Sequence, residues 1–160
     1  MLAGEFVESA VLVPDDAAPG DYFGGTVSLD GDRAAVGAAW DDDTGTNSGS
    51  VWMFERQEDS TWAQVAKLTA ADGFENNWFG SSLSLDGDRV LVGAVKGINN
   101  GARSGCAYIF DRQDDGTWTQ QAKLVAWDSA AADYFGYSVA SAGDVNGDGY
   151  VDVIVGAYAV

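Results

Sequence analysis

The sequence predicts an all-β fold of repeated four-stranded antiparallel sheets, because it combines an internal repeat, short strand-like runs and regularly spaced turn signals. Phe-Gly pairs recur at Phe23, Phe79 and Phe135, at intervals of 56 residues. Further positions keep the same interval, among them Leu12, Leu68 and Leu124, Trp62 and Trp118, and Lys67 and Lys123. No apolar period of about 3.6 residues is present, which argues against a stack of helical repeats.

Each unit is predicted to contain four short strands. In the first full unit the strand-like runs lie at residues 25–29, 33–39, 49–56 and 61–68. Asp30-Gly31 separates the first two runs, and Asp86-Gly87 separates their counterparts in the second unit. Because Asp-Gly between alternating apolar residues is a strong hairpin signal, a tight type I′ turn is expected at both places. Each Phe-Gly phenylalanine is expected to be buried between adjacent sheets, with its glycine allowing close backbone approach.

Units of this length with four strands are typical of β-propeller blades, which pack face to face around an axis. Residues 1–160 are therefore interpreted as a single repeat domain: an outer strand of a preceding blade at 1–13, repeats at 14–69 and 70–125, and a truncated repeat at 126–160. That is just under three blades, whereas closed propellers usually have about four to eight. A fragment of a larger product is favoured over several copies that assemble.

The most informative segment for chemistry is the loop at residues 144–152, which reads DVNGDGYVD. Asp144, Asn146, Asp148 and Asp152 would supply side-chain oxygens, and Tyr150 its backbone carbonyl, in the spacing that calcium (Ca²⁺) requires. An EF-hand is excluded, because position twelve is a valine and the loop leads into a β-branched run. The alternative is a turn rich in Asp, Asn and Gly that binds no metal.

The Phe-Gly and Gly-Ala signature, as in Phe23-Gly24 with Gly37-Ala38, together with the loop at 144–152, resembles the FG-GAP repeats of integrin α-subunits. This resemblance implies a propeller, with calcium in the hairpin loop between the first two strands of some blades. It also implies a location outside the cytoplasm. Of the three repeats, only the third matches the calcium pattern, because the loops at Asp30 and Asp86 are too short to encircle an ion.

The net charge of the chain limits the classes of partner that it can bind. The formal net charge of −17, from 25 acidic and 8 basic residues, argues against binding to nucleic acid or to anionic membranes. Asp41-Asp42-Asp43 could add a weaker cation site, although a solvated acidic loop is the favoured interpretation. Cys106 stands alone, so the chain has no internal disulfide. No apolar run is long enough to insert in a membrane and no export signal is visible, so such a signal is expected outside this segment.

Catalysis is not expected. The chain has no histidine and no glycine-rich phosphate loop. The six tryptophans are expected to pack between blades, although Trp78 and Trp127 could form a carbohydrate-stacking surface. The sequence therefore predicts a calcium-binding, integrin-α-like propeller segment that serves as an extracellular binding or adhesion scaffold for an unidentified protein or carbohydrate. The alternatives are a structural module of a larger secreted enzyme and a short propeller that self-assembles into a homo-oligomeric ring.

Overall fold

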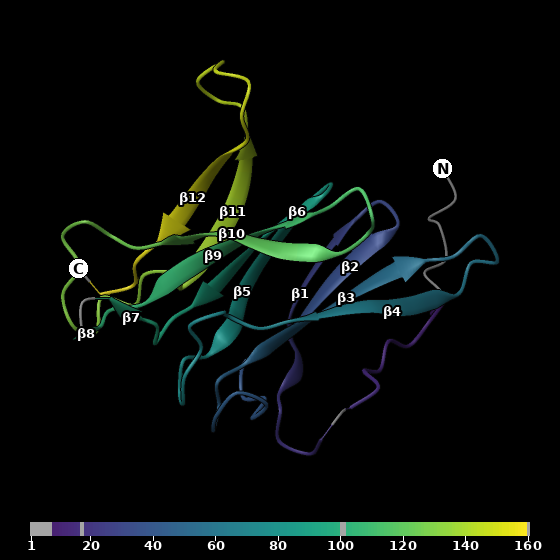
Figure 1. Ribbon diagram of the computed structural model, residues 1–160, viewed down its shortest axis with the longest axis horizontal. Coiled ribbons are helices and arrows are strands. Elements are labelled where there is room, and N and C mark those ends of the chain that lie inside the picture. The colour runs from purple at the N-terminus through teal and green to yellow at the C-terminus, as the bar shows by residue number, and fades with distance from the viewer. Residues whose placement is uncertain (1–7, 17, 100–101, 160) are drawn as a thin grey trace, which may run out of the picture.

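A computed structural model describes residues 8–16, 18–99 and 102–159, and this part of the chain contains strands and loops but no helix (Figure 1). Two four-stranded antiparallel sheets are followed by a two-stranded sheet, and a further short two-stranded pair lies in a connection of the second sheet. The all-β prediction is confirmed, and the three sheets are blades of an incomplete β-propeller.

The first two sheets have the same strand order, from an inner to an outer strand. The first sheet is ordered β1-β2-β3-β4 and the second β5-β6-β9-β10. The bounds in the first sheet are β1 Phe23–Asp30, β2 Arg33–Ala38, β3 Ser50–Arg56 and β4 Trp62–Leu68. Those in the second are β5 Phe79–Asp86, β6 Arg89–Ala94, β9 Cys106–Arg112 and β10 Trp118–Leu124.

The remaining strands form two hairpins. The third sheet pairs β11, Ser138–Gly143, with β12, Asp152–Gly156. A short pair, β7 at Ile98–Asn99 and β8 at Ala102–Arg103, interrupts the connection between β6 and β9 and was not anticipated from the sequence. Figure 1 shows the β11–β12 loop projecting away from the sheets.

The tight hairpins differ from the prediction by one residue. Asp30 pairs with Arg33, so the two loop residues are Gly31 and Asp32 rather than Asp30 and Gly31. Gly31 has a φ of 54°, and it is the only one of these two residues with positive φ. A type II′ turn needs positive φ at its first loop residue alone, whereas type I′ needs it at both. The predicted type I′ turn is therefore wrong, and the second repeat shows the same shift, with Asp86 paired to Arg89.

The blades are joined by an apolar core and by hydrogen bonds that repeat from one blade to the next. Side chains of β3, including Val51 and Met53, share one buried cluster with Phe79 and Tyr108 of the second sheet. Between inner strands, the Thr26 hydroxyl donates to the Gly80 carbonyl at 2.6 Å. The equivalent Ser82 hydroxyl donates to the Gly136 carbonyl at 2.8 Å, which extends the same contact to the third blade.

Of the three Phe-Gly phenylalanines expected to be buried between adjacent sheets, only Phe79 is fully buried. Phe79 is completely buried, and a Cβ on Gly80 would lie 2.7 Å from the carbonyl oxygen of Ser50, so glycine is needed there. Phe23 and Phe135 are only half-buried. The reason is that Phe79 lies between two four-stranded sheets, whereas the other two belong to the outermost sheets of the described chain.

The outer strand expected at residues 1–13 is not formed in the part that is described. Residues 8–13 belong to no strand, and residues 1–7 lie outside the described residues. A strand needs a hydrogen-bonding neighbour, and residues 8–13 pair with none of the described strands. Leu12 nevertheless packs against the cluster on the outward face of the first sheet, together with Phe23 and Trp62.

Candidate metal centre

The loop proposed to bind calcium lies in the hairpin of the third blade. Gly143 pairs with Asp152 across β11 and β12, so residues 144–151 replace the two-residue loops of the first two blades. The structure places Asp144, Asn146, Asp148 and Tyr150 in one exposed loop, whereas Asp152 is half-buried as the first residue of β12.

Asp144 organises this loop. One carboxylate oxygen of Asp144 accepts hydrogen bonds from the backbone N–H groups of Gly147 at 2.6 Å and Asp148 at 3.1 Å. The other oxygen accepts from the N–H of Gly149 at 2.9 Å. Gly147 and Gly149 have φ values of 77° and 88°, which glycine adopts without steric cost. The two glycines thus allow the backbone to wrap around the first carboxylate.

The other three side chains are linked through Asn146. The amide nitrogen of Asn146 donates to a carboxylate oxygen of Asp148 at 3.1 Å and to one of Asp152 at 3.3 Å. Asp152 also accepts from the N–H of Val145 at 2.9 Å. The partial positive charge of an amide N–H₂ group therefore lies between two carboxylates. As placed, the described residues include no group of three or more His, Cys, Asp or Glu side chains that could hold a metal, so the donor set stays a prediction.

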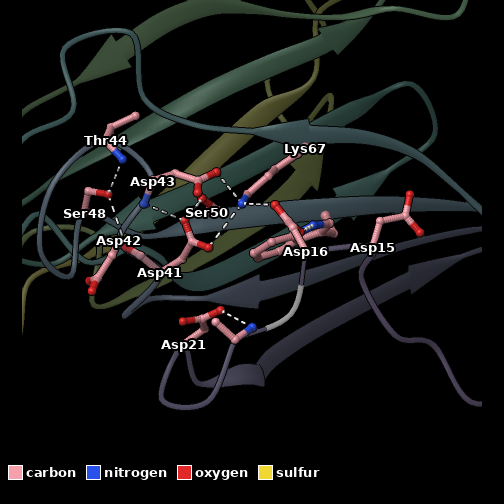
Figure 2. Close-up of polar contacts among 12 residues, drawn as sticks. Asp15, Asp16, Asp21, Asp41, Asp42, Asp43, Thr44, Ser48, Ser50 and Lys67 are labelled. Carbon is pink, nitrogen blue, oxygen red and sulfur yellow. Dashed lines mark hydrogen bonds and ion pairs between the residues drawn. The ribbon is translucent and has the colours of Figure 1, made fainter.

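A second acidic cluster surrounds Lys67 on the first blade, and Figure 2 shows three carboxylates directed at its ammonium group. Nζ of Lys67 lies 2.6 Å from Asp16 and 3.2 Å from Asp41, and it also pairs with Asp43. The Asp41 side chain is only 4% exposed and accepts a further hydrogen bond of 2.6 Å from the Ser50 hydroxyl. Burial alone would lower the pKa of Lys67, but hydrogen bonds to the three carboxylates outweigh it and raise that pKa.

This geometry revises the interpretation of Asp41-Asp42-Asp43. Asp41 is buried, so it does not belong to a solvated acidic loop. The ammonium group of Lys67 already provides a positive charge for these carboxylates, and it also lies 4.3 Å from the ring centroid of Trp52. Sequence reasoning missed this cluster. The available signal was that Asp16 and Asp72 keep the same 56-residue interval as Lys67 and Lys123.

The second blade repeats part of this arrangement around Lys123. Its Nζ lies 2.6 Å from Asp72, which also accepts a hydrogen bond of 2.9 Å from the Tyr108 hydroxyl. Burial works to raise the pKa of Asp72, but these two hydrogen bonds prevail and lower it. Burial also raises the pKa of the Cys106 thiol, which lies 3.4 Å from the Tyr108 hydroxyl. Cys106 is thus a buried core residue, as expected of a small strand side chain.

The tryptophans divide between core and surface. Trp52 is completely buried, whereas Trp127 is 95% exposed. Trp78 lies 6.3 Å from Trp40 between ring centroids, and Trp127 pairs with no aromatic ring among the described residues. The two rings suggested as a carbohydrate surface, Trp78 and Trp127, therefore do not form an aromatic pair in this part of the chain.

Comparison with known proteins decides the family. A sequence profile described as FG-GAP repeat matches residues 6–54, 62–110 and 118–160. The chain belongs to the FG-GAP repeat family. The three matched FG-GAP segments start 56 residues apart, which is the interval of the Phe-Gly pairs. The matched segments do not begin at the same residues as the repeats predicted from the sequence at 14–69, 70–125 and 126–160. Those predicted boundaries stay a prediction.

Three similar proteins are integrin α-subunits. The FG-GAP chain is 28% identical to mouse integrin alpha-E over 158 residues, which covers 86% of the chain and 14% of that protein. It is 30% identical to human integrin alpha-E over 121 residues, covering 68% of the chain and 10% of that protein. Human integrin alpha-11 is 30% identical over 154 residues, covering 86% of the chain and 13% of that protein. The chain thus spans only a small part of the relatives it matches. No helix long and apolar enough to cross a membrane occurs among the described residues.

Proposed function

We propose that this chain is a calcium-stabilised FG-GAP propeller segment that serves as an extracellular binding or adhesion scaffold. The observation that carries the proposal is the loop at 144–152, at the position of a tight turn in the other blades. There the Asn146 amide joins the carboxylates of Asp148 and Asp152, and backbone N–H groups of the loop bond to the carboxylate of Asp144. All of these donors are oxygen-bearing groups, which is the chemistry that calcium prefers over transition metals. The extracellular location rests on the resemblance to integrin α-subunits.

Calcium would be held by the side chains of Asp144, Asn146, Asp148 and Asp152 and by the carbonyl of Tyr150. The ion supplies positive charge that offsets repulsion among the three carboxylates. In the structure the Asn146 amide partly fills this role, since it donates to both Asp148 and Asp152. On binding, these two carboxylates would exchange the amide for the ion, and the hairpin of β11 and β12 would become more rigid.

The proposal assigns no catalytic residue. Several acidic side chains outside the loop are engaged in hydrogen bonds within turns, such as Asp59 with Thr61, or in ion pairs, such as Asp111 with Arg89. A role as a structural module of a larger secreted enzyme is the alternative, and it would use the same calcium loop.

Isothermal titration of the chain with calcium tests the proposal. Wild type is expected to bind one calcium ion, and Asp148→Ala is expected to lose binding, because too few charged oxygens remain to offset dehydration of the ion. Asp114→Ala is the matched control, since it removes one exposed carboxylate from the β9–β10 turn and should leave binding unchanged. Equal calcium uptake by wild type and Asp148→Ala would refute the assignment.

A further inference from the structure

Two basic side chains stand out because they lack acidic partners in a very acidic protein. All eight lysines and arginines lie in the described part of the chain, against 25 acidic residues in the sequence. Six of the eight form ion pairs with described residues: Arg33, Arg56, Lys67, Arg89, Arg112 and Lys123. Within the same part of the chain, Lys96 and Arg103 form none. With three acidic residues for each basic one, two bases without carboxylate partners require an explanation.

Both of these side chains line the same hollow, at the junction of the second and third repeats. The hollow has a volume of about 400 Å³ and is lined by Asn76, Lys96, Arg103, Ala131, Ala132 and Tyr134. Its lining comes from three connecting segments on one end of the blades, the opposite end from the loop at 144–152. Two positive charges therefore converge on an accessible surface that contains no acidic side chain in its lining.

Neutral contacts hold the two cations in place. The guanidinium of Arg103 donates to the backbone carbonyl of Asn76 at 3.1 Å and lies 5.2 Å from the ring centroid of Phe74. Nζ of Lys96 lies 3.6 Å from the ring centroid of Trp78. Carbonyl dipoles and aromatic faces orient a cation without neutralising its charge. Both groups are thus positioned in advance and keep their charge for a ligand.

The repeat architecture itself does not require these bases. The equivalent positions in the first repeat, 56 residues earlier, are Trp40 and Asn47. The first repeat forms the same four-stranded sheet with these uncharged residues. Lys96 and Arg103 are therefore a local property of the second repeat, which points to recognition rather than to folding.

We infer that this hollow binds the carboxylate of an Asp or Glu side chain presented by a protein partner. Arg103 offers the planar N–H donors that match a carboxylate, and Lys96 adds a second charge. A polyanion such as nucleic acid fits poorly, because the net charge of −17 repels it over a long range. A single carboxylate is different: distant charges are screened over about 8 Å in physiological salt, and the lining of the hollow carries two cations and no acidic side chain. The choice of a protein partner rests on the proposed scaffold function.

The test is an NMR titration of the ¹⁵N-labelled chain with N-acetyl-glutamate methylamide, with N-acetyl-glutamine methylamide as the neutral control. The glutamate probe is expected to bind with a Kd of about 1 to 10 mM, in the range of one isolated charged contact. It should shift the amide signals of Lys96, Arg103 and Tyr134. Loss of one charge-assisted hydrogen bond weakens binding about tenfold, so Arg103→Gln should raise the Kd by that factor. Arg56→Gln, which removes the same charge from an exposed site, should not.

Several results would overturn the inference. These are no localised shifts up to about 20 mM probe, equal affinity for the glutamine control, an unchanged Kd in both Arg103→Gln and Lys96→Gln, or tighter binding of inorganic phosphate than of the glutamate probe. Because Arg103 is exposed, its variant should keep the wild-type amide spectrum, so a changed Kd is not a folding effect. Repeating the titration with Asp148→Ala separates the two proposals, since loss of calcium binding should leave the distant hollow unaffected.

Discussion

Replacing Phe79 by alanine is the most direct perturbation of the packing between blades. The ring is completely buried between the first and second sheets. Its centroid lies 5.5 Å from that of Tyr108 and 5.8 Å from that of Phe110, with interplanar angles of 63° and 70°. Emptying a packed aromatic site costs about 3–5 kcal/mol, and the two edge-to-face contacts place Phe79→Ala in the upper part of that range.

Urea unfolding followed by tryptophan fluorescence measures this loss. Phe135→Ala is the matched control, because Phe135 holds the same position in the next repeat but is only half-buried, and we expect it to cost about 1–2 kcal/mol. Phe79→Leu retains much of the apolar volume and gives a milder variant if the alanine variant does not fold. A loss below about 1 kcal/mol for Phe79→Ala would show that the ring is not packed between sheets, and the blade register would be wrong.

Three further predictions follow from the ion pairs and the outer faces. Lys67→Met should cost about 2–4 kcal/mol in the same urea assay, because it leaves the buried carboxylate of Asp41 without a counter-charge; an unchanged midpoint would contradict this. The pKa values of Asp16 and Asp72 are lowered in the folded state, so both carboxylates stabilise the fold fully above about pH 4. This contribution to the free energy of unfolding is lost as the pH falls through the lowered folded-state pKa values. Thermal melts should therefore show falling stability below about pH 4, and a flat profile there would refute the assignment. Leu29, on the inner strand of the first sheet, is 67% exposed, and Ile154, on the edge strand of the third sheet, is 65% exposed. We therefore expect self-association or marginal stability, and a highly stable monomer in analytical ultracentrifugation would contradict it.

The repeat made most of the fold predictable from sequence. A fixed interval of 56 residues, combined with Asp-Gly turns and apolar alternation, placed the four strands of the first sheet to within two residues of their observed ends. The turn type was wrong because the pairing of Asp30 with Arg33 depends on strand register, which the Asp-Gly signal does not specify. The two-residue strands β7 and β8 have no periodic pattern long enough to predict.

The sites were predictable only where their residues are local in sequence. The residues proposed to bind calcium lie within nine positions of the sequence, so their spacing alone suggested this set, which stays a prediction. The cluster around Lys67 joins residues 26 and 51 positions apart, and only the fold brings Asp16 and Asp41 to one ammonium group. In the loop itself, the sequence could not show that the amide of Asn146 lies between two carboxylates, because side-chain orientation depends on the local backbone.

Hydrogen exchange followed by mass spectrometry, with and without calcium, tests the central claim most directly. If the loop at 144–152 binds calcium and supports the third blade, peptides that cover β11 and β12 should exchange at least about tenfold more slowly with calcium, because opening of the hairpin then requires release of the ion. Peptides from the first sheet should not change, and Asp148→Ala should abolish the effect. Identical exchange of β11 and β12 in the presence and absence of calcium, or equal slowing in the first sheet and in the Asp148→Ala variant, would contradict the account.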